Sequence, residues 1–321
     1  MQADPPQKVI PEETVTPDAV AGHWSLRLLP RPARPYGRLM RLERPIGWWL
    51  LLLPCWWSAL LAAGADTPPL TLAATLILFL IGAVAMRGAG CVYNDIVDRD
   101  IDAKVARTRL RPIPAGEVSV RGALVFMLVL ALVGLGVLVQ FNGFAILTGL
   151  ASLGVIAAYP FMKRITHWPQ AVLGLAFSWG ALMGFAVLRA DLPPAAFALY
   201  AGTILWVIAY DTIYAHQDRE DDAIVGVKST ALLFGACTRP ILAGFYGAAL
   251  ILFAGAFVLE EVGTAAWIGL CFAAGQLYWQ VTTLDIDDGE NCLRRFKSNR
   301  GFGLILCAGL LADWIGAYAL P

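Results

Sequence analysis

The sequence has little charge and few of the residues that build soluble metal or disulfide proteins. Charged residues make up 15% of the chain, against about 25% in an ordinary soluble domain, and the formal net charge is +0. A neutral chain of this kind is not a general nucleic-acid binder. The six cysteines form no CxxC pair and the three histidines have no metal-ligand spacing. Both a disulfide scaffold and a zinc site are therefore disfavoured.

The N-terminal segment lacks the apolar core of a secretory signal. Residues 1–45 are rich in proline and mix acidic residues with arginine, without an apolar run of about 7 to 15 residues. The acidic residues also fit poorly with a mitochondrial transit peptide. We expect a disordered cytoplasmic tail over residues 1–35, followed by one membrane domain over residues 36–321.

Long apolar runs are the feature that the chain has in abundance. Hydrophobic residues make up 58% of the sequence, and the mean hydropathy is +0.65. A run of about 20 apolar residues crosses a bilayer as a helix, because in lipid the backbone must satisfy its own hydrogen bonds. The sequence thus predicts an all-α polytopic membrane protein with nine spans, placed at about 46–64, 70–93, 121–140, 143–162, 170–189, 194–215, 239–259, 264–283 and 302–320.

Basic residues alternate between the loops and predict the orientation of the chain. The segment before the first span and the even-numbered loops carry almost all of the lysine and arginine, whereas the odd-numbered loops carry almost none. Positive residues concentrate on the cytoplasmic side of a membrane protein. We therefore expect a multi-pass protein of the cell inner membrane, with its N-terminus and active site cytoplasmic; the mitochondrial inner membrane is the alternative.

A first acidic cluster, "YNDIVDRDID", follows the second apolar span. Asn94, Asp98 and Asp102 are spaced i, i+4 and i+8 and share one face of a continuing helix. Like charges at this spacing repel, and a divalent cation such as Mg²⁺ would compensate them through its preference for oxygen ligands. The alternative is a solvated loop whose aspartates pair with Arg99 and Lys104.

A second acidic cluster, "YDTIYAHQDREDD", ends the sixth span on the same predicted side. Asp211, Tyr214, Asp218 and Asp222 follow at i, i+3, i+7 and i+11, again on one helical face. Asp211 lies near the end of an apolar span, where an ionisable group is costly and indicates function. The two clusters are therefore interpreted as halves of one divided site.

Basic residues accompany both clusters. Arg87 lies seven residues before Asn94 and so on nearly the same helical face, and Tyr159 and Lys163 stand one turn apart at the end of the fourth span. Carboxylate-bound cations beside arginine and lysine would suit a diphosphate. Membrane topology alone is the competing explanation for the arginines at 107, 109 and 111.

These motifs resemble those of the UbiA superfamily of intramembrane prenyltransferases. "NDIVDRDID" is similar to the NDxxDxxxD motif and "YDTIYAHQDREDD" to the YDTxYAxxDxxDD motif. The resemblance extends through "RLERPIGWWLLLLPCWW", "RTRLRPIPAG", "YPFMKRITHWPQ" and "VKSTALLFG", and so covers roughly residues 36–320. Within the superfamily, the sequences of these motifs most resemble those of the 4-hydroxybenzoate polyprenyltransferases of ubiquinone biosynthesis.

The resemblance implies a fold and a set of site residues. The fold would be nine transmembrane helices bundled around a central cavity with a lateral opening for the prenyl tail. Mg²⁺ would bridge the motifs and a polyprenyl diphosphate. The implied metal ligands are Asn94, Asp98, Asp102, Asp211, Asp218 and Asp222. The implied catalytic residues are Asp98, Asp218, Arg107, Lys163 and Tyr159, and the implied substrate contacts are Arg41, Arg87, Arg107, Arg111, Tyr159, Lys163 and Tyr214.

The expected reaction is transfer of the prenyl group to 4-hydroxybenzoate, ortho to the hydroxyl, with release of diphosphate. Arg41 would face the carboxylate of the aromatic acid, with Arg44 as a competitor for that role. The alternatives are a prenyltransferase with another acceptor, such as homogentisate, a naphthoate or haem, and a secondary transporter whose acids bind coupling ions. The expected partners are the two substrates and the lipid bilayer, with no nucleic acid.

Two further acidic features lie outside these clusters. The segment "DIDDGEN", residues 285–291, is interpreted as a lid or a solvated loop rather than as a third metal site. Asp313, in the last span, either faces the cavity or pairs with a neighbouring helix.

Overall fold

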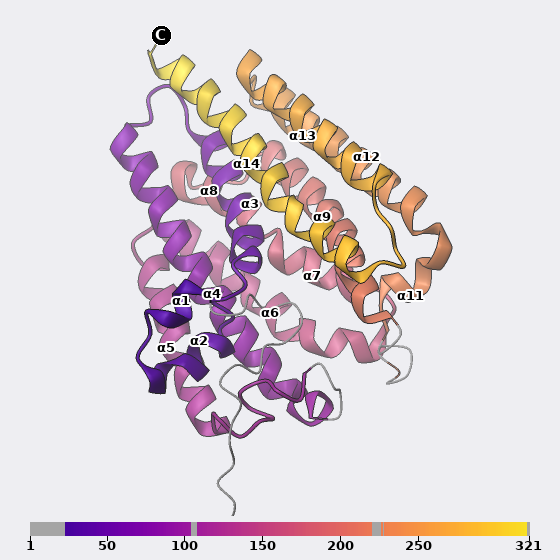
Figure 1. The fold of residues 1–321 in the computed structure, drawn as a ribbon. Helices are drawn as coiled ribbons and strands as arrows, with labels where there is room; N and C mark the ends of the chain where they lie inside the picture. The colour runs from indigo at the N-terminus through magenta and orange to yellow at the C-terminus, as the bar shows by residue number, and fades with distance from the viewer. Residues whose placement is uncertain (1–22, 104–107, 220–225, 227, 320–321) are drawn as a thin grey trace, which may run out of the picture.

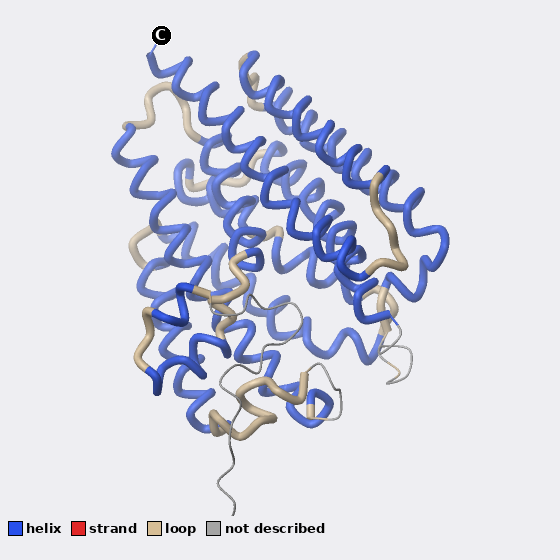
Figure 2. Tube along the Cα trace, in the orientation of Figure 1, coloured by secondary structure: helices blue, strands red, loops and turns tan. Residues whose placement is uncertain are grey.

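The computed structural model describes residues 23–103, 108–219, 226 and 228–319, and it is mainly helical (Figure 1). Figure 2 shows helices joined by loops and turns, and no strand within the described part of the chain. The predicted all-α class is confirmed. The side chains of Ile101, Pro160, Lys163, Arg164 and Asp218 are outside the description.

Long helices follow one another through the chain at the positions of the apolar runs. In chain order they are α3 (Ile46–Ala62), α4 (Pro69–Asp102), α5 (Val120–Leu138), α6 (Gly143–Ile165), α7 (Pro169–Phe177), α8 (Gly180–Arg189), α9 (Pro194–Ala215), α12 (Thr238–Leu259), α13 (Thr264–Thr282) and α14 (Gly289–Ala319). The short helices η2 (His216–Asp218), α11 (Thr230–Phe234) and η3 (Gly235–Cys237) lie between α9 and α12.

The number of membrane spans depends on how the broken and short helices are counted. Six helical segments of the described chain are long and apolar enough to cross a membrane, among them α7 with α8 and α11 with α12 taken as continuous segments. Helix α3 and the segment Gly143–Tyr159 of α6 are shorter apolar helices. The prediction of nine spans is not confirmed by these criteria and stays a prediction.

Helix starts follow local chemistry that is visible in the sequence. Ser119 accepts a hydrogen bond from the Gly122 backbone amide and caps α5, and Asn142 accepts one from the Ala145 amide and caps α6. Helices α4, α7 and α9 begin with proline, whose missing N–H costs nothing in the first turn. These signals set where the apolar runs begin as helices.

The helical part of the chain begins earlier than expected. Helix α1 (Trp24–Arg27), η1 (Arg31–Ala33) and α2 (Arg34–Leu39) precede the first long helix, so residues 24–35 are not part of an irregular tail. Residues 1–22 lie outside the described residues. Leu39 is fully buried against α4 and the neighbouring loops, which fixes α2 at the basic end of the bundle.

The fifth apolar run, predicted as one span, contains two helices, α7 and α8. Gly184 of α8 packs against α3 so closely that a Cβ would lie 2.1 Å from the Ala59 nitrogen. The Ser58 hydroxyl of α3 accepts a hydrogen bond from the Phe185 amide at 3.2 Å. A small residue and a hydroxyl side chain thus allow α8 to pack closely against α3.

The core is an aromatic cluster contributed by α3, α9, α12 and α14. Trp57 lies 5.1 Å from Trp206 and 5.8 Å from Phe253, and Trp206 lies 5.3 Å from Phe302, between ring centroids. Trp57 Nε1 donates to the Gly303 carbonyl at 2.9 Å. Buried indole N–H groups need such a partner. This cluster fixes α14 against α3 and α9 beside the cavity described below.

Apolar side chains also cover outward surfaces of the bundle. Leu124, Val125, Leu128 and Leu132 of α5 are each about half exposed or more. In water such a continuous apolar face would be a liability, but against lipid it is the expected surface. The outward face of α5, on the left of Figure 1, therefore supports the integral membrane character of the chain.

The two acidic features outside the motifs, Asp313 and residues 285–291, both contact neighbouring segments. Asp313 accepts a hydrogen bond from the Gly263 amide at 2.9 Å, at the start of α13, so it pairs with a neighbouring helix. Asp287 is 73% exposed and accepts a hydrogen bond from Arg219 at 2.9 Å. The loop before α14 is therefore largely solvated and lies beside Arg219 of the second acidic motif.

Candidate active site

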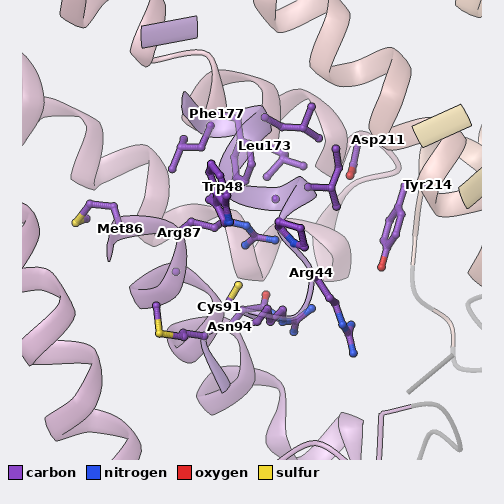
Figure 3. A pocket seen from close by; sticks show the side chains of 18 of the residues that line it. Arg44, Trp48, Met86, Arg87, Cys91, Asn94, Leu173, Phe177, Asp211 and Tyr214 are labelled. Carbon is purple, nitrogen blue, oxygen red and sulfur yellow. The ribbon is translucent and has the colours of Figure 1, made fainter. Parts of the chain in front are cut away.

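A cavity of about 440 Å³ opens among the helices at the basic end of the bundle. Its wall is built from the α2–α3 connection and from α3, α4, α6, α7, α9 and α14. Figure 3 shows Arg87 and Asn94 on one side of the pocket and Asp211 and Tyr214 on the other. Residues from both acidic motifs therefore line one cavity, although more than a hundred positions separate Asn94 from Asp211 in the sequence.

The first motif forms the last turns of α4 and is buried. Asp95, Asp98 and Asp102 are 1%, 0% and 6% exposed. Arg41 donates to Asp95 at 2.8 Å, and Arg111 donates to Asp95 at 3.2 Å and to Asp102 at 2.7 Å. Arg99, one of the two partners considered from the sequence, pairs with the exposed Asp100, and Lys104 lies outside the described residues.

Arg41 reaches Asp95 from a strained backbone position. Its φ is 61°, in the left-handed region that non-glycine residues seldom adopt. Such a conformation persists only where the surroundings fix it, and it clusters at functional sites. The ion pair with Asp95 is one contact that fixes it, and the cavity wall that includes Arg41 is the site concerned.

Asp102, at the outer end of the first motif, has a pKa that is raised by burial. Asp102 lies beyond the apolar span, which ends at Asp100. Burial raises the pKa of Asp102 above its ordinary value, and the neighbouring Asp95 and Asp98 raise it further, against the opposing effect of the Arg111 guanidinium. Ionised Asp102 therefore depends on Arg111, which makes that arginine part of the motif.

The second motif begins in α9 and leaves it through η2. Asp211 and Tyr214 line the cavity. The Thr212 hydroxyl lies 2.6 Å from that of Thr230, and His216 Nε2 lies 3.0 Å from the Thr238 hydroxyl. These bonds attach the end of α9 to α11 and to the start of α12. The direction in which the motif leaves the helix is thereby fixed by uncharged groups.

The His216–Thr238 contact defines the state of the imidazole. The Thr238 hydroxyl donates its proton to the Gly235 carbonyl at 2.7 Å, so its oxygen accepts from His216 Nε2–H. His216 Nδ1 is buried without a hydrogen-bond partner among the described residues. Burial, together with the positive charge of Arg219, lowers the pKa of His216 to about 4, so the ring is neutral near pH 7.

Arg87 and Tyr159 connect the two halves of the site. Arg87 passes so close to α3 that a Cβ on Gly47 would lie 2.6 Å from its Nε, and its guanidinium lies 5.4 Å above the Phe177 ring. The charge of Arg87 acts on Asp211. Tyr159 lines the same cavity and interacts electrostatically with Asp98 of the first motif and Asp211 of the second. The halves therefore converge as the sequence predicts.

Several predicted site residues cannot be placed. Arg107 and Asp222 lie outside the described residues. The backbones of Lys163 and Asp218 are described, at the end of α6 and in η2, but their side chains are not. Arg111 is placed, against the first motif rather than in the cavity wall. The roles of these residues in binding stay predictions.

The oxygen groups of the wall suit a hard cation, although no complete ligand set is formed. Within the described residues, no group of three or more histidine, cysteine or acidic side chains could hold a metal ion. Asn94 and Asp211 present amide and carboxylate oxygens to the cavity, and Asp98 is buried one turn from Asn94. Such ligands are those that Mg²⁺ prefers, and Mg²⁺ takes its remaining oxygens from water and phosphate.

Asp95 has a role that helical spacing does not predict. It accepts hydrogen bonds from two arginines and joins the α2–α3 connection to the loop after α4. Helical spacing could not find this contact, because both partners come from other segments. Asp100, by contrast, is 78% exposed on its side chain and pairs with Arg99.

Comparison with known proteins identifies the family. The model of the UbiA prenyltransferase family matches residues 51–306. The chain belongs to the UbiA prenyltransferase family. This membership sets aside the alternative of a secondary transporter and confirms the resemblance carried by the two aspartate motifs.

Two relatives show how far the similarity extends. The chain is 48% identical over 287 residues to the mitochondrial 4-hydroxybenzoate polyprenyltransferase of Bos taurus, covering 88% of this chain and 76% of that protein. It is 44% identical over 289 residues to the protein of the same name from Arabidopsis thaliana, covering 90% of this chain and 70% of that protein.

Solved structures share the fold. An apo structure of a UbiA homologue from Aeropyrum pernix K1 matches with a TM-score of 0.67 at 25% identity, covering 83% of this chain and 97% of that one. A UbiA homologue from Archaeoglobus fulgidus bound to GPP and Mg²⁺ matches with a TM-score of 0.63 at 20% identity, covering 89% and 100%.

The predicted location in a bacterial cell inner membrane is wrong. Relatives from a plant, a mammal, an insect and a nematode are all named mitochondrial, which points to the mitochondrial inner membrane. The loop charges could not decide this, because a positive-inside bias distinguishes the two sides of one membrane but not one membrane from another. The integral membrane character itself is supported.

Proposed function

We propose that this UbiA-family enzyme transfers a polyprenyl group from polyprenyl diphosphate to 4-hydroxybenzoate, as in ubiquinone biosynthesis. The allylic C–O bond breaks and diphosphate leaves with the bonding electrons. A C–C bond then forms between the allylic carbon and the ring carbon ortho to the hydroxyl, and that ring carbon loses its proton. The relatives that carry the 4-hydroxybenzoate polyprenyltransferase name support this choice of acceptor over homogentisate, a naphthoate or haem.

One observation of the structure carries the proposal. Asn94 of the first motif and Asp211 of the second line the same cavity, together with the cationic Arg87, which α4 carries about two turns before Asn94. An apolar bundle that places carboxylates and a guanidinium around one enclosed space is suited to a substrate with a charged head and an isoprenoid tail. The prenyl chain would leave along the apolar walls, and its length is not set by these residues.

The basic residues beside the motifs would take up charge on the leaving group. Tyr159 lines the cavity within electrostatic reach of both motifs, and Lys163 follows one turn later on α6. Fixed cations and a hydroxyl donor aimed at a departing diphosphate stabilise charge where it develops. We assign Tyr159, Lys163 and Arg107 to this role, in agreement with the motifs that contain them.

Mg²⁺ is the metal that the donor set favours. Asn94, Asp98 and Asp211 would hold it, together with Asp218 and Asp222. When bound, the metal would neutralise diphosphate oxygens as a Lewis acid, an effect of several kcal/mol on such reactions. The carboxylate of Asp102 is already engaged by Arg111 at 2.7 Å, so we assign it to support of the motif as much as to direct ligation.

The cavity wall also excludes water from the allylic cation. Trp48 and Phe177 line the space around Arg87, and Trp48 stacks on Trp49 at 4.6 Å between ring centroids. A water-free aromatic wall protects a carbocation from quenching and strengthens the electrostatic effects inside the site. Arg41, expected at the acceptor's carboxylate, faces Asp95 at 2.8 Å, and we assign it to ordering of the first motif.

Purified protein assayed with Mg²⁺, radiolabelled 4-hydroxybenzoate and a series of polyprenyl diphosphates tests this function. We expect prenylated 4-hydroxybenzoate and an equal amount of released diphosphate, both lost when EDTA removes the metal. Homogentisate and 1,4-dihydroxy-2-naphthoate serve as rival acceptors in parallel reactions. Faster turnover of either rival would assign the enzyme to another branch of the family.

A further inference from the structure

Helix α14 brings four basic residues near its start, and two of them are used outside the cavity. Arg294 lies 3.7 Å from Asp288 and 3.5 Å from Glu290, in the loop and first turn that precede it. Arg295 lies 4.0 Å above the Trp279 ring. These contacts explain both residues as charges at the membrane surface, in agreement with the positive-inside bias.

The other two, Lys297 and Arg300, line the cavity. With Leu293 and Phe296 they follow the spacing i, i+3, i+4 and i+7, so one face of α14 forms this part of the wall. Throughout the described ranges, neither Lys297 nor Arg300 has a hydrogen-bond or ion-pair partner. Both are exposed residues near the start of α14, before the apolar run at about 302–320.

Two other cations of the cavity wall pair with a carboxylate: Arg41 bonds to Asp95 at 2.8 Å, and Arg44 Nε lies 3.3 Å from Glu43. Arg87 lies 5.4 Å above the Phe177 ring, and its charge acts on Asp211. Lys297 and Arg300 offer further positive charge to the cavity, without an ion-pair partner among the described residues. An anionic substrate group would supply the missing partner.

The neighbours of Lys297 indicate the kind of anion. The Phe296 ring lies 4.7 Å from Tyr214 and 5.7 Å from Tyr210, so aromatic faces lie beside the cationic pair. The Trp206–Asn299 hydrogen bond, 2.9 Å, holds this turn of α14 against α9. Arg300 lies about one helical turn beyond Lys297, away from the loop end of the helix. Aromatic rings next to two cations suit an aromatic carboxylate.

We infer that Lys297 and Arg300 form the carboxylate subsite for the aromatic acid. This inference rests on the proposed function and adds the residues that select a charged acceptor. The ring would lie against Phe296 and Tyr214, and the carboxylate would accept hydrogen bonds from the ammonium and guanidinium groups. The diphosphate would occupy the part of the cavity between the two aspartate motifs, on α4 and α9.

Paired acceptors that differ only in charge test the inference. Methyl 4-hydroxybenzoate keeps the ring and hydroxyl of 4-hydroxybenzoate but has no carboxylate. We expect the wild-type enzyme to prefer the acid, and K297M/R300M to lose about 10- to 100-fold in kcat/KM for the acid while keeping its rate with the ester. The KM for the polyprenyl diphosphate should not change.

Two variants serve as controls on the same helix. K297R/R300K keeps both charges and should retain most of the preference for the acid. R294M removes a charge that pairs with the preceding loop and should leave both acceptors unaffected. Detergent gel filtration and thermal unfolding confirm that each variant is folded before its kinetics are read.

Three results would overturn the inference. An equal loss with both acceptors, accompanied by a raised KM for the polyprenyl diphosphate, would assign the pair to the diphosphate. Unchanged kinetics in K297M/R300M would make both residues topological charges only. A wild-type enzyme that prenylates acid and ester equally well has no carboxylate subsite, and this arm does not depend on the folding of any variant. A wild-type enzyme that prenylates neither would instead refute the proposed function.

Discussion

The two aspartate motifs face one cavity but are supported in opposite ways. The first motif is buried at the end of α4 and is held by charge pairs, with Arg41 and Arg111 on Asp95 and Asp102. The second leaves α9 through neutral hydrogen bonds, Thr212 to Thr230 and His216 to Thr238. One half of the site is therefore ordered by buried ion pairs, and the other by buried hydrogen bonds between groups without formal charge, since the Arg219–Asp287 ion pair of the second motif is exposed.

This difference separates stability from ligand binding in each motif. Buried charges are costly unless every partner is present, so the first motif should collapse when one arginine is removed. Neutral hydrogen bonds cost less to break, because breaking one leaves no buried charge without a partner. The following experiments break or sharpen this contrast, from the largest expected effect to the smallest.

Replacement of the central aspartate in either motif should have the largest effect. D98A and D218A should each lower Mg²⁺-dependent turnover by at least about 100-fold, because each removes a group assigned to the metal and diphosphate. The rate of prenyl transfer and membrane extraction of the protein are measured together. D100A, at an exposed position of the first motif, is the control with near-normal activity. Near-normal activity of both D98A and D218A would defeat the metal assignment.

Loss of Arg111 should destabilise the protein as well as the site. R111M leaves Asp95 and Asp102, both almost fully buried, without that partner, and the expected cost is about 3 to 5 kcal/mol of unfolding free energy. Thermal and denaturant unfolding in detergent measures it. R109M, at an exposed position in the same loop, should unfold like the wild type. Equal stability of R111M and R109M would mean that the ion pairs do not order the first motif.

Loss of the neutral His216–Thr238 hydrogen bond should cost less unfolding free energy than loss of Arg111. T238V leaves the His216 Nε2–H group without its acceptor, which is expected to cost about 1 to 3 kcal/mol. The half-saturating Mg²⁺ concentration should rise with little change in kcat at saturation, because the motif is displaced but its carboxylates remain. T75V is matched to it, since Thr75 is also buried but bonds only within its own helix, to the Thr71 carbonyl. The contrast fails if both variants shift the Mg²⁺ requirement equally.

The pH dependence of stability should differ in sign between the motifs. His216 has a folded-state pKa of about 4, below its ordinary value of 6.5, so acidification from about 6.5 to 4 protonates the unfolded chain first and lowers stability. Asp102 has a raised pKa, so acidification toward its ordinary value of 3.8 protonates the folded state first and raises stability.

Unfolding midpoints across this pH range separate the two contributions. H216Q should make the loss of stability on acidification shallower, and D102N should make it steeper. These slopes are the smallest expected effects. If H216Q and D102N changed the slope of stability against pH in the same direction, the two motifs would not differ in the sign of their pH dependence.

Much of this protein could be predicted from local patterns. Apolar runs located the long helices, and the spacing of Asn94, Asp98 and Asp102 placed them on one face of α4. The motif letters identified the family. The fifth apolar run forms one span-length segment, Pro169–Arg189, as predicted, but its division into α7 and α8 was not predicted. The organelle was missed because loop charge does not report it.

The sequence by itself determined that the chain is helical, lies in a membrane and carries two acidic motifs, since hydrophobicity and helical periodicity act over a few turns of one segment. Tertiary structure decided which charges meet. Asp95 received Arg41 and Arg111 rather than Arg99, and Lys297 and Arg300 turned toward the cavity while Arg294 and Arg295 did not. Such choices depend on distances between helices, and those distances are set by packing of the whole bundle rather than by spacing along one segment.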